Sequence, residues 1–163
     1  MNLIVAVDQN WGIGKKGGLL VHLPGDLKFF KEKTLGKVVV MGRTTLESLP
    51  GQRPLPGRTN IVLSRNADYQ KEGCVVIHSK EELEELREKY GEDEVFIIGG
   101  GTLYKEFLDL CEKLYVTRIF STFGADTFFP NLDETKEFEI TWESDVQLEK
   151  GVSYVWLEYT RCK

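Results

Sequence analysis

The stretch EVFIIGGGTLYKEFLDL, residues 94 to 110, contains the pattern that decides the fold. It opens on a continuous run of apolar residues, which is typical of a strand buried on both faces of a parallel sheet. Three glycines then separate this run from the helical pattern TLYKEFLDL. A strand, a tight turn and a helix in this order form the repeating unit of α/β proteins.

The same alternation extends along the chain in both directions. We expect strands at 3–7, 37–42, 60–64, 74–78, 94–99, 114–120, 138–143 and 152–161, and helices at 25–34, 43–48, 79–90 and 101–109. The first five strands are mostly continuous apolar runs, whereas the last two alternate more and have no helix between them, which favours an antiparallel edge. Because no linker or repeat divides the chain, the sequence predicts one α/β domain over residues 1–163.

The helix expected at 79–90 has the clearest end signals. Ser79 with Glu82 fits a capping box, and Gly91 follows as a stop signal. Residues 79–94 hold eight acids and three bases, which equals the net charge of −5. We interpret its acidic outer face as a solvated surface.

The overall charge and composition exclude several classes of protein. An acidic chain with 41% hydrophobic and 29% charged residues is typical of a soluble globular protein and argues against a nucleic-acid binder. The segment 36–66 differs, because it holds five basic residues and only one acid. This basic segment fits either a site for a small anionic ligand or scattered solvated arginines.

The cysteines and the N-terminus indicate a cytoplasmic protein. Cys74, Cys111 and Cys162 are odd in number and far apart, and no Cys/His spacing predicts a metal site. We expect reduced thiols and no metal. MNLIVAVDQN has no basic segment and only a short apolar run, so we expect neither a signal peptide nor a membrane span.

Residues 12 to 17, GIGKKG, match the spacing of a dinucleotide-binding fingerprint. That fingerprint requires a helix at its third glycine, so that the helix N-terminus meets the pyrophosphate. Here Gly17 is followed by another glycine and then by LLVHLP, which is no helix start. We therefore predict a long glycine-hinged loop of the kind that acts as a lid.

Three strand ends carry donors that suit a phosphate. The first is the glycine run 99–101, the second is Arg43-Thr44-Thr45 after a strand, and the third is Ser64-Arg65-Asn66. Glycine turns between a strand and a helix let backbone N–H groups approach phosphates, although tight packing alone also explains such glycines. Three donor-rich strand ends without acidic residues favour a phosphate-bearing cofactor.

Asp26 is unusual because it lies among Leu23, Leu27, Phe29 and Phe30. One interpretation is an acid in the first helical turn that stabilises the helix dipole by about 0.3–1 kcal/mol. At about 100° per residue, however, Phe30 lies only about 40° from Asp26, and Phe29 about 60° on the other side. An unpaired carboxylate there would cost several kcal/mol or take up a proton. We therefore expect a partner, either a cationic or amidine-like ligand or a protein group such as a threonine hydroxyl.

Seven segments together resemble bacterial dihydrofolate reductases. They are GIG (12–14), HLPGDLKFFK (22–31), VVMGRTTLES (39–48), RPLPGRTNIVLSR (53–65), VFIIGGGTLY (95–104), LYVTRI (114–119) and DTFFP (126–130). The resemblance implies a central eight-stranded, mixed and mostly parallel sheet flanked by four helices. It also implies reduction of 7,8-dihydrofolate to tetrahydrofolate with NADPH, with antifolate inhibitors as further small-molecule partners. We expect a monomer, since no heptad or apolar patch in the sequence requires a partner chain.

The resemblance also assigns residues to the two ligands. For the substrate it implies Ile4, Ala6, Asp26, Leu27, Phe30, Leu49, Leu55, Arg58 and Thr117, with Asp26 bound to the pterin and supported by Thr117, and with Arg58 on the glutamate carboxylate. For NADPH it implies Arg43, Ser64 and Arg65 at the 2′-phosphate, and Thr45, Gly100, Gly101 and Thr102 at the pyrophosphate. It implies Ile13, Gly14 and Leu19 in a lid, Ile98 and Tyr104 at the nicotinamide, and Ala6, Thr44 and Leu103 elsewhere in the cofactor site.

The implied mechanism is direct hydride transfer to pterin C6, with a proton reaching N5 through water aided by the charge of Asp26. One departure from the family is Leu20-Val21, where a Pro-Trp pair is usual, and Val21 has no side-chain donor. We therefore expect a rearranged water network there. Two alternatives are a related pyrimidine reductase of riboflavin synthesis, expected to lack Asp26, Phe30 and Arg58 together, and a non-catalytic pterin-binding protein.

Overall fold

The computed structural model describes residues 1–163, except for the side chain of Glu92. The helices are α1 (Pro24–Thr34), α2 (Arg43–Ser48), α3 (Lys80–Arg87) and α4 (Gly101–Phe107), with 3-10 turns η1 (Pro50–Gln52), η2 (Glu92–Glu94) and η3 (Leu108–Leu110). The strands are β1 (Asn2–Val7), β2 (Gly12–Gly14), β3 (Val38–Gly42), β4 (Thr59–Leu63), β5 (Cys74–Ile77), β6 (Val95–Gly99), β7 (Lys113–Ile119), β8 (Thr127–Phe128), β9 (Phe138–Glu143), β10 (Gln147–Glu149) and β11 (Val152–Arg161).

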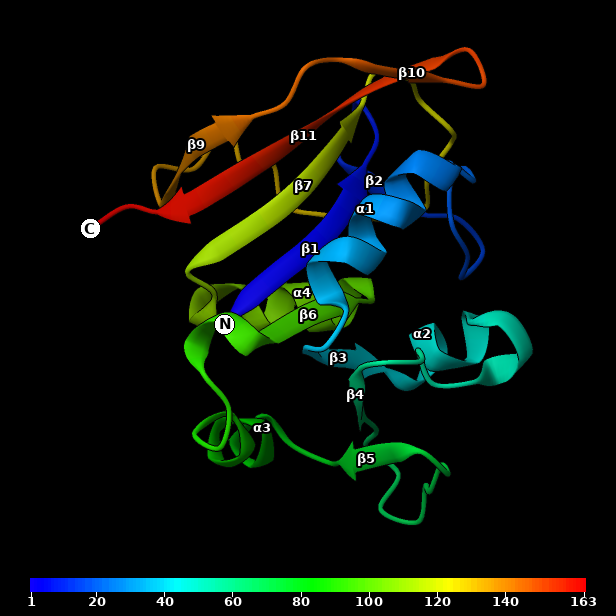
Figure 1. Ribbon diagram of the computed structural model, residues 1–163, viewed down its shortest axis with the longest axis vertical. Coiled ribbons are helices and arrows are strands. Elements are labelled where there is room, and N and C mark those ends of the chain that lie inside the picture. The colour runs from blue at the N-terminus through cyan, green and yellow to red at the C-terminus, as the bar shows by residue number, and fades with distance from the viewer.

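The central sheet runs in the order β10-β11-β7-β1-β6-β3-β4-β5, and β9 also pairs with β11 (Figure 1). The six strands from β7 to β5 are parallel, whereas β11 is antiparallel to β7. Strand β10 pairs with one end of β11 and β9 pairs with the other end, so β9 and β10 together occupy one position at the edge of the sheet. The sheet is therefore eight positions wide, and the mixed, mostly parallel architecture with four helices is confirmed.

Two layers of helices cover the sheet. In β3, Val38 and Val40 pack in a cluster with the α3 and α4 side chains, whereas Val39 and Met41 pack with Leu46 of α2 on the other face. This alternation is the period-2 pattern of a strand buried on both faces. Figure 1 shows α1 in front of β1 and α4 behind the sheet, as right-handed crossovers require.

The structure differs from the expected elements mainly at helix ends. Helix α3 ends at Arg87 rather than at residue 90, because Lys89 and Tyr90 donate i→i+3 hydrogen bonds that tighten the last turn. The Ser79 hydroxyl caps the Glu82 N–H as predicted. The Glu82 carboxylate, however, accepts from the His78 N–H at 3.1 Å rather than from Ser79, so the capping box is shifted by one residue.

Three short strands were not predicted from the sequence. Strand β10 extends the sheet edge, and β2 pairs with β8 in a separate two-stranded sheet. Each has only two or three residues, which is too few for a periodic pattern. Among the described residues, no helix has the length and apolar composition to cross a membrane.

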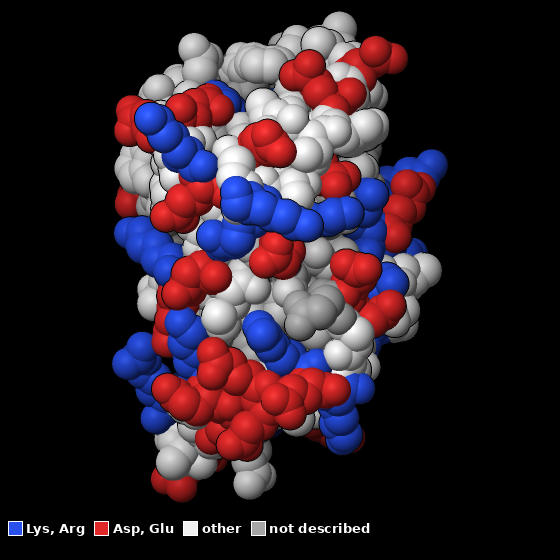
Figure 2. Space-filling model, turned by 90° about the vertical axis from the view of Figure 1, so that its left-hand side faces the viewer, with Lys and Arg blue, Asp and Glu red and all other residues white. Residues whose placement is uncertain are grey.

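Acidic side chains gather over α3, low on the face shown in Figure 2. Leu83 of the same helix is fully buried. The helix therefore has one acidic outer face and one apolar inner face, as the sequence predicts.

Candidate active site

A cavity of about 670 Å³ opens at the carboxyl ends of β3, β4 and β6. All fifteen residues that the resemblance implies for the cofactor line it: Ala6, Ile13, Gly14, Leu19, Arg43, Thr44, Thr45, Ser64, Arg65, Ile98, Gly100, Gly101, Thr102, Leu103 and Tyr104. Asn66, which the sequence placed at the third donor-rich strand end, also lines it, whereas Thr127 and Ser48 are wall residues that sequence reasoning missed. Thr127 comes from β8, whose pairing with β2 brings it to the wall. We call this space the large cavity.

Two helices begin at the wall of the large cavity without any acid in their first turn. Neither α2 nor α4 has a side-chain cap at its N-terminus. Their first backbone N–H groups lack intrahelical partners, and the positive end of each helix dipole is not neutralised by a carboxylate. The large cavity therefore offers two sets of donors suited to phosphate groups.

The glycine run serves close packing as well as access to the large cavity. A Cβ atom on Gly101 would lie 2.7 Å from the Thr127 methyl group, and one on Gly100 would lie 3.3 Å from the Thr45 hydroxyl. Gly99 has a φ of +127°, which side chains rarely adopt. Close packing between the strand and the helix, which the sequence left open as an explanation, therefore does require these glycines. The same glycines also leave room for a ligand.

The two arginines at the rim of the large cavity are already engaged. Arg43 Nε donates to Glu47 Oε1 at 2.7 Å, and its guanidinium lies 4.5 Å from the centre of the Tyr69 ring. Arg65 is largely exposed and has Glu106 Oε2 at 3.9 Å. The first turn of α2 holds no acid, as the sequence indicates, and the carboxylate that engages Arg43 lies one helical turn later, at i+4.

A small recess of about 40 Å³ adjoins the large cavity and shares Ala6, Ile13 and Leu19 with it. Asp26 and Leu27 of α1 form part of its wall. Ala6, Thr117 and Trp156 stand opposite one another on β1, β7 and β11, so they share one face of the sheet. Alanine at the first of these positions leaves the space that the recess occupies. We call this space the recess.

The Asp26 carboxylate has two side-chain donors. Thr117 Oγ1 donates to Asp26 Oδ1 at 2.6 Å, and Trp156 Nε1 donates to the same oxygen at 2.9 Å. The threonine partner is the protein group that the sequence predicted, and the contact is confirmed. The tryptophan partner was missed, because its register against β7 is not readable from the sequence.

Burial raises the pKa of Asp26, and three polar neighbours modify this effect. The hydrogen bonds from Thr117 and Trp156 lower the pKa, whereas the negative charge of Glu149 raises it further. The net direction is upward, so desolvation exceeds the stabilisation by the two donors. A carboxyl group with a raised pKa is typical of functional sites.

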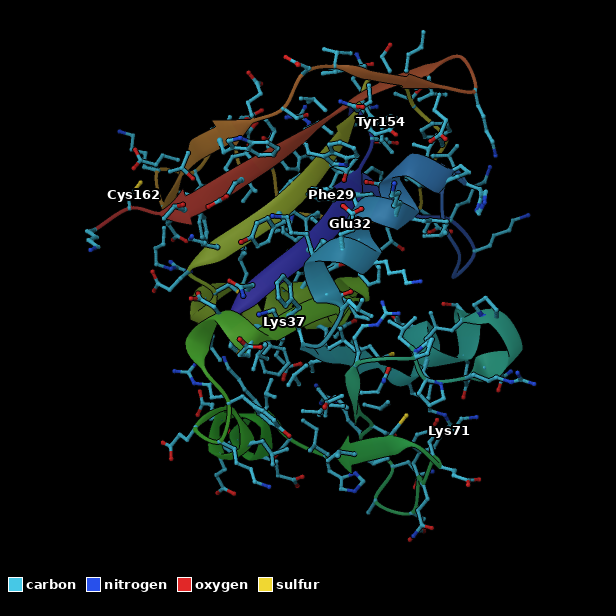
Figure 3. The ribbon with its side chains drawn as sticks, viewed as in Figure 1. Phe29, Glu32, Lys37, Lys71, Tyr154 and Cys162 are labelled. Carbon is cyan, nitrogen blue, oxygen red and sulfur yellow. The ribbon has the colours of Figure 1, made fainter. Side chains whose placement is uncertain are left out.

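Phe29 and Phe30 are not among the wall residues of the recess, but Phe29 shares its side of α1 with Asp26, because both contact Trp156. Phe29 stacks on Trp156, with ring centroids 4.6 Å apart and 10° between the planes. Figure 3 shows Phe29 lying between α1 and the strands β7 and β11. Phe30 is half-buried, and its carbonyl accepts a hydrogen bond from Thr34 at the end of the helix.

Arg58 lies against the last turn of α1, far from Asp26. Its Nη1 donates to Thr34 Oγ1 at 3.1 Å and its Nε to the Pro56 carbonyl at 3.0 Å. Thr34 is eight residues after Asp26, which corresponds to about 12 Å along a helix. A carboxylate and a guanidinium are thus held at the two ends of α1.

The remaining predicted substrate residues lie on different sides of the site. Leu49 and Leu55 pack against the cluster around Val39 and Met41. Ile4 is buried, and its carbonyl accepts the Tyr104 hydroxyl at 2.8 Å. The structure brings Asp26, Leu27, Ala6 and Thr117 together, while the others surround them at a greater distance.

The loop between β1 and α1 has no helix before Pro24, so the dinucleotide fingerprint is absent from it, as the sequence indicates. Gly17 has a φ of +77°, and Leu19 is 70% exposed although it lines both spaces. The Lys16 N–H donates to Asp126 Oδ2 at 2.8 Å, which ties the loop to the residues before β8.

Comparison with known proteins gives consistent matches over the whole chain. Residues 1–161 match the model of the family described as dihydrofolate reductase. A dihydrofolate reductase of Haemophilus influenzae is 44% identical over 87% of this chain and 85% of that protein, and one of Neisseria meningitidis serogroup A is 42% identical over 99% and 98%. The solved structure of dihydrofolate reductase from Enterococcus faecalis, complexed with NADP(H) and RAB-propyl, superimposes with a TM-score of 0.89 at 42% identity, covering 99% of this chain and 96% of that one.

Proposed function

The chain belongs to the dihydrofolate reductase family and is an NADPH-dependent enzyme that reduces 7,8-dihydrofolate to 5,6,7,8-tetrahydrofolate, and on this premise we propose which residues perform each part of the reaction. The large cavity takes the cofactor and the recess takes the pterin. The shared wall of Ala6, Ile13 and Leu19 is where the two rings meet. The observation that carries this assignment is the paired Asp26 carboxylate beside a cavity rich in phosphate donors.

The residues of the large cavity fit NADPH. Bound NADPH supplies the hydride. The uncapped N-termini of α2 and α4 offer Thr45 and the Gly100–Thr102 backbone to the pyrophosphate. Arg43, Ser64 and Arg65 bind the 2′-phosphate, for which two guanidinium groups and a hydroxyl are suitable donors. Thr44 lies beside them on the same wall.

The inner part of the large cavity positions the nicotinamide. Ile98, Leu103 and Tyr104 form an apolar slot there, and the Tyr104 hydroxyl is held by the Ile4 carbonyl. Ile13, Gly14 and Leu19 belong to the loop that closes over the ring, and the exposed Leu19 is the side chain that closure buries. These residues position one ring against the other and exclude water, which is the main contribution of a protein to cofactor chemistry.

The substrate lies along α1. Asp26 accepts hydrogen bonds from the amidine-like edge of the pterin, with Thr117 supporting the carboxylate. Leu27 walls the pterin in the recess, and Phe30, Leu49 and Leu55, which lie outside the recess, wall the aminobenzoyl group. Arg58, about 12 Å along the helix from Asp26, binds the carboxylate of the glutamate tail. A molecule with a basic head and an acidic tail fits this spacing.

The proton reaches pterin N5 through water, and Asp26 assists it by its charge. Burial raises the pKa of Asp26, but the hydrogen bonds from Thr117 and Trp156 favour the ionised carboxylate that carries this charge. The same two donors hold the carboxylate in position. No step requires a side chain in contact with N5.

We also propose that the enzyme acts as a monomer in the cytoplasm. No heptad pattern in the sequence requires a partner chain. The three cysteines are free thiols, as is usual in a reducing compartment. Light scattering after gel filtration should give the mass of one chain with and without NADPH, whereas twice that mass would contradict the monomer.

The assignment is tested by NADPH oxidation with and without dihydrofolate. We expect Asp26→Asn to lower kcat/KM by about 10²- to 10⁴-fold, because the polar contact and the charge are lost together. Asp145→Asn, at an exposed aspartate between β9 and β10, makes the same chemical change away from the site and should leave the rate unchanged. Full activity in Asp26→Asn would contradict the role of Asp26.

A further inference from the structure

Trp156 and Thr117 direct their donors at the same oxygen of Asp26. The two distances are 2.9 Å from the indole Nε1 and 2.6 Å from the threonine hydroxyl, and both end on Oδ1. The two residues are directly paired across β7 and β11, so both side chains point to the α1 face of the sheet. Both side-chain hydrogen bonds described for the carboxylate therefore hold one oxygen, and Oδ2 is left for a ligand in the recess.

The indole ring is fixed from several sides. Phe29 stacks on its face at 4.6 Å, and the Tyr154 ring meets its edge at 5.7 Å with 69° between the planes. The Trp156 backbone N–H also donates to Ser144 Oγ at 2.9 Å. A ring packed in this way has few alternative rotamers, so its N–H is pre-organised toward Asp26. Figure 3 shows Phe29 on α1 and Tyr154 near the end of β7 that lies beside the start of α1.

The opposite wall of the recess offers no comparable donor. Leu20, Val21 and Ile119 line it with apolar side chains. Val21 packs in the same small cluster as Trp156, and its side chain has no hydrogen-bond donor. The indole is thus the second side-chain donor that the described part of the protein supplies to this carboxylate.

We propose that Trp156 is a positioning residue for Asp26. Its indole N–H and the Thr117 hydroxyl fix the rotation of the carboxylate, so that Oδ2 is presented to the two N–H groups of the pterin edge. A carboxylate held by one oxygen cannot turn away from the ligand, and this orientation is present before the substrate binds. The proposal rests on the role that the proposed function gives to Asp26.

The groups around Asp26 set the expected effect on protonation. Glu149 of β10 and Tyr154 of β11 are the titratable groups that influence Asp26 electrostatically. The recess walls from β1 and the loop before α1 contribute uncharged side chains. The Trp156 hydrogen bond stabilises the ionised carboxylate, so its loss raises the pKa of Asp26 and moves any activity inflection of Asp26 to higher pH.

The test is the pH profile of kcat/KM for dihydrofolate in Trp156→Phe at saturating NADPH. Phenylalanine keeps a ring against Phe29 and removes only the N–H. The inflection due to Asp26 is identified as the one that disappears in Asp26→Asn. We expect it to rise by about one pH unit in Trp156→Phe, since a hydrogen bond to a charged group corresponds to roughly that shift. The KM for dihydrofolate should increase while the KM for NADPH stays constant.

Trp142→Phe is the matched control. Trp142 lies on β9 opposite Glu158 of β11 and is 48% exposed. It neither lines the recess nor donates to Asp26, so the same chemical change should leave the profile as in the wild type. Phe29→Leu is a second variant that keeps the indole N–H but removes its stacking partner. Phe29→Leu should shift the inflection in the same direction by a smaller amount. If Trp156→Phe does not fold, Phe29→Leu replaces it as the test variant.

The outcomes separate the two proposals. If Trp156→Phe folds and its inflection matches the wild type, while Asp26→Asn loses activity, Trp156 has no positioning role and the proposed function stands. If Phe29→Leu, used in its place, leaves the inflection unmoved, the proposal is likewise overturned. If Asp26→Asn itself retains the wild-type rate and profile, the proposed role of Asp26 fails, and the inference fails with it.

Discussion

Asp26 occupies a place where burial and hydrogen bonding oppose each other. Burial favours the neutral acid, while the donors of Thr117 and Trp156 favour the carboxylate. The net effect is a raised pKa, and a ligand that brings N–H donors into the recess would favour the ionised form. At a plain helix start, an acid would remain exposed, and the helix dipole would favour its ionised form.

At the scale of one residue, Glu47 weakens the expected binding of the 2′-phosphate by Arg43. Its carboxylate engages Arg43 at 2.7 Å, at the position where the 2′-phosphate is expected to bind. An incoming phosphate must compete with this carboxylate and is repelled by its charge. We predict that Glu47→Gln lowers the KM for NADPH by about two- to fivefold, the usual scale of exposed ion pairs.

The comparison of two cofactors checks the Glu47 prediction. NADH lacks the 2′-phosphate, so its KM should be the same in Glu47→Gln and the wild type. Glu143→Gln, at an exposed position of β9, should change neither value. Equal improvement for NADH and NADPH would show that Glu47 acts on something other than the phosphate.

At the scale of elements, the β10–β11 hairpin holds the start of α1. Glu149 accepts a hydrogen bond from the Gly25 N–H at 3.0 Å, and Lys150 donates to the His22 carbonyl at 3.0 Å. The Tyr154 hydroxyl reaches the same Glu149 at 3.3 Å. Glu149 thus replaces the missing side-chain cap at Leu23 and brings a negative charge close to Asp26.

Glu149→Gln is predicted to shift the pH profile in the direction opposite to Trp156→Phe. The charge of Glu149 disfavours a second negative charge nearby, so its removal lowers the pKa of Asp26 and moves the inflection to lower pH. The free energy of unfolding should fall by about 0.3–1 kcal/mol, because an acid at a helix N-terminus is lost. The pH profile of kcat/KM and urea unfolding measure the two effects.

The matched control for Glu149→Gln is Glu139→Gln, at an exposed position of β9. It removes one negative charge from the same edge of the sheet without touching α1. Its pH profile should equal that of the wild type. A shift of similar size in both variants would mean that net charge, rather than the contact with α1, controls the inflection.

The sequence predicted the elements better than their contacts. All eight expected strands and four expected helices exist, because their apolar patterns act locally, and α3 also has a side-chain cap. Thr117 was found as a partner of Asp26 through the resemblance. Trp156 was not, since it lies 130 residues from Asp26 and meets it only through the register of β11 on β7. The Arg43–Glu47 pair could have been predicted from the sequence, because the two residues have the i,i+4 spacing of a helical ion pair.

At the scale of the whole molecule, the cofactor site and the substrate site share one sheet. The strand ends of β3, β4 and β6 line the large cavity, while β1, β7 and β11 provide the row behind Asp26. Because β1 lies between β7 and β6, the large cavity and the recess adjoin at its carboxyl end. Under the proposed assignment, this strand order brings the two reacting rings together.

We predict that residues 1–163 unfold as one cooperative domain. The urea transitions followed by tryptophan fluorescence and by far-UV circular dichroism should coincide. NADPH at about 100 times its Kd should raise the free energy of unfolding by about 2.7 kcal/mol and shift both transitions together. Two separated transitions, or a shift of only one of them, would contradict a single domain.

The most direct test of the account is the pH dependence of hydride transfer in single-turnover experiments with the wild type and Asp26→Asn, from about pH 5 to about pH 8. We predict that hydride transfer is much slower in Asp26→Asn than in the wild type at about pH 8. This difference in rate should narrow as the pH falls, because solvent acid then supplies the N5 proton without the carboxylate. A deficit that stays constant over this range, or no deficit at all, would contradict the role of Asp26 in the reaction.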